Sequence, residues 1–190
     1  MSNFPRRWAR PLAVAIPWLL LVSTAAGTTV EVESVGGIMQ QPTSHYYLAS
    51  YGVNADVATD DQRIIGRGSY LERPEFRNAG YADKDSGWFG FVGTKITKQS
   101  NRGLYAFLGF GRMAGYVKTT PAVAAAEVPP EKVSYTVNGV TAALEYAAKL
   151  GPFSVALSHQ TFIGYVNSEQ LQAYVAWPFN FYTASLGVSW

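Results

Sequence analysis

The segment that decides the fold is residues 180–190, which read NFYTASLGVSW. From Tyr182 to Trp190 every second residue is apolar or aromatic, whereas the residues between them are Thr, Ser and Gly. Alternation with a period of two places the apolar side chains on one face of a β-strand and the polar side chains on the other. The segment therefore predicts a strand that turns one face toward lipid.

This strand ends on an aromatic residue, Trp190. The ending resembles the C-terminal signature of Gram-negative outer-membrane β-barrel proteins, in which the last strand closes the barrel and is recognised by the assembly machinery. The resemblance implies a location in the cell outer membrane, and it implies the barrel assembly machinery as a partner.

The other end of the chain is typical of a secretory signal peptide. Three arginines among the first ten residues precede an uncharged apolar run from Leu12 to Val22, and small residues follow as far as Gly27. This run is too short to cross a bilayer, which takes about 20 residues, so we expect cleavage after it. The sequence thus predicts a signal peptide over residues 1–27 and a barrel over residues 28–190.

The composition supports an envelope protein that is not a helical membrane protein. Aromatic residues make up 14% of the chain and charged residues 15%, against about 25% charged residues in an average protein. Mean hydropathy is nevertheless zero, and no second long apolar run exists. Apolar residues spread over alternate positions fit a barrel. A net charge of +2 without a basic cluster after the signal gives no reason to expect nucleic acid.

The rest of the chain consists of short alternating segments separated by turn residues. Nine such segments can be delimited: Thr29–Ile38, Tyr46–Ala55, Ile64–Glu72, Gly87–Thr97, Gly103–Val117, Tyr135–Ala148, Phe153–Ile163, Gln170–Trp177 and Phe181–Trp190. Bacterial single-chain barrels have an even number of antiparallel strands. We therefore predict an all-β, antiparallel transmembrane barrel of eight strands, in which the first segment lies partly outside the wall or the last two form one strand bent at Pro178. A ten-stranded barrel, with a further strand in Pro121–Pro130, is the alternative.

The lengths of the connections predict the orientation of the barrel, because such barrels have short periplasmic turns and longer extracellular loops. The short links Lys98–Arg102 and Lys149–Pro152 are expected on the periplasmic side. The long links Arg73–Ser86 and Lys118–Ser134 are expected on the extracellular side, and their many charged residues are expected to be solvated.

Glu31, Glu33 and Glu145 lie within the predicted strands, and we expect all three to point into the barrel. Glu145 alternates with apolar residues that suit lipid, and Glu31 and Glu33 alternate with valines. A charge on the lipid side at mid-membrane depth is costly. Lys95 and Arg112 are the predicted partners, in a polar network that fills a narrow interior.

One group of residues suggests chemistry on the outer wall. His159 and Thr161 share the outward phase of the segment Phe153–Ile163, and Glu169 follows in the outward phase of the next segment. This layout resembles the outer-membrane lipid A 3-O-deacylase family, eight-stranded barrels with a His-x-Ser-Asn segment on the penultimate strand and a Glu on the next. The resemblance implies His159 as base, Glu169 as its orienting group and Thr161 in the position of the nucleophile. Thr161 stands where the family has Ser, and Phe162 where it has Asn.

These observations predict an integral outer-membrane barrel with a structural role, a loop-mediated interaction or narrow transport, and they favour a protein without enzymatic activity. The alternative is a carboxylic ester hydrolase that modifies lipid A at the outer leaflet. Outer-membrane lipid and lipopolysaccharide are the expected surroundings. With two histidines, no cysteine and no phosphate-binding or dinucleotide motif, we expect neither a metal site nor a cofactor.

Overall fold

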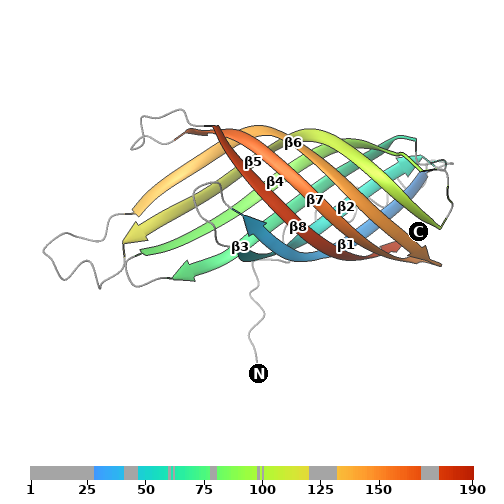
Figure 1. Ribbon diagram of the computed structural model, residues 1–190, viewed down its shortest axis with the longest axis horizontal. Coiled ribbons are helices and arrows are strands. Elements are labelled where there is room, and N and C mark those ends of the chain that lie inside the picture. The colour runs from blue at the N-terminus through green and yellow to red at the C-terminus, as the bar shows by residue number, and fades with distance from the viewer. Residues whose placement is uncertain are drawn as a thin grey trace, which may run out of the picture.

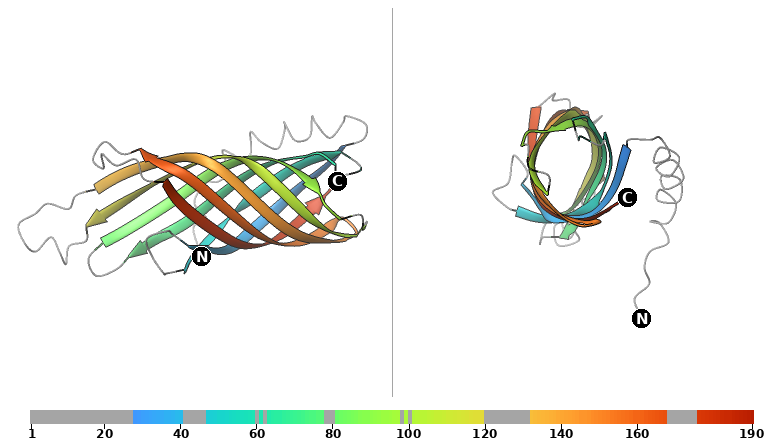
Figure 2. Two further views of the ribbon diagram at one scale, coloured as in Figure 1. Left: turned by 45° about the horizontal axis from the view of Figure 1, so that its top comes forward. Right: turned by 90° about the vertical axis from the view of Figure 1, so that its right-hand side faces the viewer.

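The computed structural model describes residues 28–40, 47–59, 61, 63–77, 81–97, 99, 101–119, 132–167 and 176–190. Within these residues eight strands form one closed antiparallel barrel, in which each strand is hydrogen-bonded to the next and β8 to β1 (Figure 1; Figure 2). The strands are β1 (Thr28–Gln40), β2 (Tyr47–Thr59), β3 (Ile65–Arg77), β4 (Tyr81–Lys95), β5 (Arg102–Thr119), β6 (Lys132–Leu150), β7 (Phe153–Asn167) and β8 (Ala176–Ser189). The predicted eight-stranded barrel is confirmed. None of the described residues belongs to a helix long and apolar enough to span a membrane.

The number of strands is settled at the end of the chain, where β8 runs without interruption through Pro178. The separate segment predicted at Gln170–Trp177 is wrong in its last residues, because Ala176 and Trp177 already belong to β8. Its first residues, the strand considered in Pro121–Pro130 and the signal peptide predicted over residues 1–27 lie outside the described residues.

An apolar belt covers the outer wall. Phe110, Leu108 and Leu186 expose 75%, 71% and 67% of their surface, and Val140, Leu144 and Leu157 also point outward. Exposed apolar residues at alternate positions around a closed barrel are the lipid-facing surface of a transmembrane barrel. The outward phases predicted for the last strand and for residues 140–148 are confirmed.

Aromatic rings fill the middle of the interior. The Phe89 ring lies 5.3 Å from the Phe162 ring and 5.8 Å from the Phe181 ring, in edge-to-face contact. Glycine on the facing strand makes room for them: a Cβ atom on Gly111 would lie 2.2 Å from the Phe89 ring. The interior of a barrel of eight strands is just wide enough to be filled by side chains. Here large rings fill it, and glycines leave the space that the rings need.

The two ends of the barrel differ in their connections. Gly151 lies between β6 and β7 with a φ of 66°, a left-handed conformation that glycine adopts without cost, and so permits the predicted short turn. At the turn between β2 and β3, the Thr59 hydroxyl and the Arg63 N–H donate to Asp61 and hold the pKa of that carboxyl below its usual value. Both turns lie at the end that we call periplasmic, following the predicted orientation.

Strands β3 to β6 continue past their neighbours at the opposite, extracellular end (left in Figure 1). The β2–β3 ladder ends at Tyr51 and Glu72, whereas β3 and β4 remain paired as far as Arg77. On the other side, β5 and β6 remain paired as far as Lys118 and Lys132, beyond the last β6–β7 pair. We refer to these four outer strand ends as the extension.

The extension corrects the prediction of a long loop over Arg73–Ser86. Most of that range is strand, with β3 reaching Arg77 and β4 beginning at Tyr81. The inward positions of these strand ends carry charged residues, so the sequence does not alternate between apolar and polar residues there. It therefore has the composition of a solvated loop.

Candidate functional site

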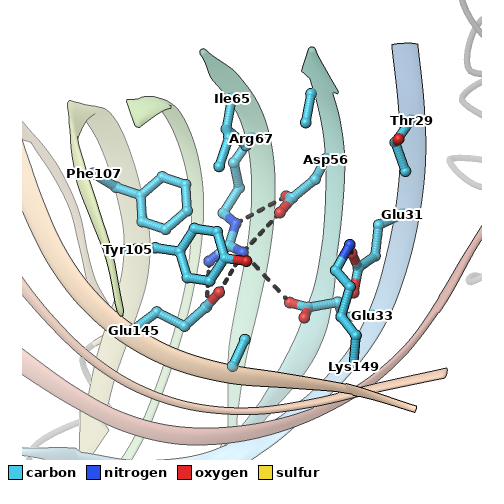
Figure 3. A pocket seen from close by; sticks show the side chains of 12 residues that line it. Thr29, Glu31, Glu33, Asp56, Ile65, Arg67, Tyr105, Phe107, Glu145 and Lys149 are labelled. Atoms are coloured by element: carbon cyan, nitrogen blue, oxygen red, sulfur yellow. Dashed lines mark hydrogen bonds and ion pairs between the residues drawn. The ribbon is translucent and has the colours of Figure 1, made fainter. Parts of the chain in front are cut away.

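The interior carries two clusters of ion pairs. The first, which we call the periplasmic ion cluster, is centred on Arg67 of β3 (Figure 3). Arg67 donates to both oxygens of Asp56 at 2.8 and 2.7 Å and to both oxygens of Glu145 at 2.6 and 3.0 Å. Glu33 lies 3.7 Å from the same guanidinium, which also stacks 4.2 Å from the Phe107 ring centre. Three buried carboxylates thus surround one arginine.

The predicted inward orientation of Glu33 and Glu145 is confirmed, because only 2% and 4% of their surface is exposed. Arg112 was a wrong choice of partner, since it is exposed on the outer face. Glu31 also points inward, where it lies 3.1 Å from Lys149 and accepts a hydrogen bond from Ser154. Lys95, the other predicted partner, lies over the ring of Tyr105.

The second cluster, the extracellular ion cluster, lies at the base of the extension. Arg73 donates to both oxygens of Asp83 at 3.0 and 2.8 Å and to Asp85 at 2.8 Å. Tyr135 of β6 donates its hydroxyl to Asp85. The side chains of Arg73 and Asp85 are each 1% exposed, so the prediction that these charged residues are solvated is wrong. They pair because an unpaired charge in a closed interior is costly.

The two ion clusters and the layer of phenylalanines follow one another along the barrel. In the β3–β4 register, Arg67 faces Phe91, Ser69 faces Phe89 and Arg73 faces Asp85. The phenylalanine layer therefore lies between the two clusters. Paired charges and packed rings thus occupy successive levels of the interior, as is expected in a barrel of eight strands.

The outer wall carries a small polar cluster within the apolar belt. Thr161 of β7 donates its hydroxyl to Asn180 of β8 at 2.9 Å, and its oxygen lies 3.5 Å from His159 Nε2. His159 Nε2 is 3.4 Å from the same Asn180 oxygen. The imidazole stacks on Tyr182, with ring centres 4.7 Å apart and planes within 4° of parallel. We call these four residues the His159 cluster.

The structure thus brings together two of the three predicted site residues. Glu169 lies outside the described residues, so its position in the group stays a prediction. Asn180 was missed, although it begins the segment NFYTASLGVSW in the same alternate row as Tyr182. An amide in the outward row of a lipid-facing strand was the signal that could have identified it.

The His159 cluster borders an apolar groove on the outer wall. The groove runs over β5, β6, β7, β8 and β1 and is lined by, among others, Gly36, Gly37, Ile38, Leu144, Leu157 and Ala184. Along β7 the cluster is flanked by the exposed apolar residues Leu157 and Ile163. Polar side chains with apolar neighbours on both sides are costly in lipid unless they bond to one another or serve a function.

The closed barrel and its apolar belt define the class of protein, and comparison with solved structures agrees. The chain is similar to Ail, the attachment invasion locus protein of Yersinia pestis, with 11% identity, a TM-score of 0.55 and coverage of 86% of this chain and 99% of Ail. It is similar to Neisserial surface protein A, with 11% identity, a TM-score of 0.56 and coverage of 86% and 97%. A major outer membrane protein from Thermus thermophilus gives 9% identity, a TM-score of 0.58 and coverage of 86% and 99%.

At this level of identity the likeness is one of fold. The chain has the fold of the small eight-stranded β-barrels of the Gram-negative outer membrane. No protein-family model matches the chain, and no curated protein matches it either.

Proposed function

We propose that this chain is an integral outer-membrane barrel that conducts no solute and acts by binding through its extracellular end. The filled interior carries the proposal, because the two ion clusters and the phenylalanine layer occupy successive levels of the barrel. A barrel of this width is plugged by its own side chains, which disfavours the narrow transport role. The functional surface is then the outer wall or the extracellular end, from which the extension projects.

The extension supports a binding role. The four strand ends of the extension carry side chains away from the membrane belt. Other strands are also joined at this end, by the connections over residues 41–46, 120–131 and 168–175. One structural neighbour, Ail, has been crystallised with the heparin analogue sucrose octasulfate. We propose that the present barrel also binds at this end.

Two measurements test the proposal. The protein refolded in planar lipid bilayers should give no discrete conductance steps, under conditions in which a general porin does. Cells that display the wild type should bind sulfated glycan or host-cell surfaces more strongly than cells that display a variant in which residues 120–131 are replaced by a Gly/Ser linker. Reproducible conductance steps from pure protein would refute the closed interior, and equal binding by both kinds of cell would refute the extracellular role.

The second candidate function is hydrolysis of a lipid A ester, and the placement of His159 beside Thr161 on the outer wall favours it. A hydroxyl nucleophile needs a base within reach and a group that orients that base. His159 lies 3.5 Å from the Thr161 hydroxyl, which is a long contact, and the hydroxyl donates to Asn180 instead. Because Asn180 accepts through its oxygen, its amide nitrogen remains available as a donor. The hydrogen bond from Thr161 to Asn180 also fits a purely structural role, because it links β7 to β8.

Mass analysis of lipid A from cells that express the barrel separates the two candidates. If the barrel is an esterase, the wild type should release an acyl chain, and His159→Ala, Thr161→Ala and Glu169→Ala should not. Thr161→Ser should be at least as active, because it lacks the methyl group that restricts χ1. Ile163→Ala, an outward change on the same strand, is the matched control. Unchanged lipid A in wild-type cells leaves the binding role and removes the esterase.

A further inference from the structure

A second polar group lies on the outer face of the extension, above the apolar belt. The Tyr116 hydroxyl donates to Glu75 at 2.5 Å, and Arg77 donates to the other oxygen of Glu75 at 2.6 Å. Lys118 lies 3.6 Å from Glu75. Lys132 lies 4.5 Å from the centre of the Tyr116 ring, and Lys118 lies 5.8 Å from it. We call these five residues the Tyr116 cluster.

The charges of the Tyr116 cluster do not balance. The cluster contains three cations, Arg77, Lys118 and Lys132, and one carboxylate, Glu75, which leaves two positive charges in excess within it. Lys118 and Lys132 are direct partners in the β5–β6 register, and both project from the outer face. Like charges directly opposite one another on neighbouring strands are destabilising. Glu75 offsets part of that repulsion through its ion pair with Lys118, and a bound anion would offset the rest.

The position of the cluster indicates where the anion comes from. Tyr116 and Lys118 share the outward row of β5 with Phe110, which is 75% exposed in the belt, and with the exposed Arg112. From Phe110 to Tyr116 the strand rises by about 15 Å, at ~3.3 Å per residue and a tilt of ~40°. The cluster therefore faces sideways, at a level beyond the hydrocarbon and beside the polar headgroups of the outer leaflet.

We propose that the Tyr116 cluster binds phosphate groups on the sugars of lipopolysaccharide in the surrounding outer leaflet. The ammonium groups of Lys118 and Lys132 act as point charges, and the exposed guanidinium of Arg77 offers a planar fork for a phosphate. Arg112, lower on the same row, adds a cation between the cluster and the belt. This proposal rests on the proposed function in one respect, namely that the extension lies on the extracellular side of the membrane.

The test uses the full-length protein in lipid nanodiscs, with lipopolysaccharide as the probe and binding measured at several salt concentrations. Lys118→Gln/Lys132→Gln should weaken binding about tenfold and flatten its dependence on salt, because two fewer counterion-like contacts form. Glu75→Gln should act in the opposite direction and tighten binding severalfold. Arg63→Gln/Arg102→Gln removes the same charge at the periplasmic end and should leave binding unchanged.

Two further probes distinguish the source of the anion. Lipopolysaccharide whose phosphates have been removed should bind the wild type as weakly as intact lipopolysaccharide binds the double lysine variant. A soluble sulfated oligosaccharide should compete poorly. The proposal is overturned by equal binding of intact and dephosphorylated lipopolysaccharide, by equal losses in the two double variants, or by tight binding of the soluble glycan alone. Unchanged heat-modifiable gel mobility shows that each variant is folded. The conductance and cell-binding measurements should be unchanged in these variants, so a failure of this proposal can be distinguished from a failure of the proposed function.

Discussion

Replacing Arg67 by methionine tests the account of the barrel interior most directly. The substitution keeps the volume of the aliphatic stem but removes the cation that faces Asp56, Glu33 and Glu145. Removing one partner of a buried ion pair costs about 3–5 kcal/mol. The carboxylates can escape that cost by binding a proton. At pH 7 this costs about 3.7 kcal/mol for one carboxyl whose ordinary pKa is about 4.3, so we expect a loss of about 4 kcal/mol.

The assay is urea unfolding in lipid vesicles, followed by tryptophan fluorescence and by the shift in gel mobility on heating. The loss should shrink at pH 4.5, because protonation of a carboxyl is then almost free of cost. Adding Glu145→Gln to the Arg67 variant should recover part of the stability at pH 7. Arg112→Met, which removes an exposed cation of the same kind, should change stability by less than about 1 kcal/mol. A loss from Arg67→Met below about 1 kcal/mol at pH 7, or an equal loss at both pH values, would refute the reasoning.

Three further changes test other parts of the barrel. Trp190→Asp should sharply lower the amount of folded protein in the outer membrane, measured by fractionation, because a charge on the lipid face is destabilising; unchanged levels would contradict this. Gly111→Ala should destabilise the barrel by about 1–3 kcal/mol in urea because of the clash with Phe89, whereas Gly90→Ala, with nothing within 4 Å of its Cβ, should be close to neutral. Tyr135→Phe should cost about 1–3 kcal/mol, because it removes a donor from the buried extracellular ion cluster; a neutral result would mean that the hydroxyl is dispensable there.

The sequence alone was sufficient for the wall of the barrel but not for its contents. Alternation identified the strands and their lipid faces, because a period of two is a local property of neighbouring residues. The pairing of Arg67 with Glu145 joins residues 78 positions apart, and only the register of the closed sheet places them together. The extension was missed for a related reason, since its buried Arg73 and Asp85 have the composition of a loop.

The candidate sites show the same limit. His159 and Thr161 lie two positions apart on one strand, so their common face could be read from the sequence. Asn180, which contacts both, comes from the next strand, and its contribution depends on the β7–β8 register. In the Tyr116 cluster, Lys118 and Lys132 lie far apart in the sequence and form no visible charge run. They become neighbours only through the β5–β6 hairpin.

The hydrogen bonds between β1 and β8 also determine when the barrel can form during synthesis. They place Glu31 opposite Ser189, so the first strand to leave the ribosome must wait for the last. Closing a loop of ~150 residues costs about 2 kcal/mol more in chain entropy than closing one of ~15 residues. Until then the edge of β1 lacks its second neighbour, and exposed edges recruit other chains. A truncated product that lacks β8 would leave the edges of β1 and β7 without a partner strand, and unpaired edges favour aggregation.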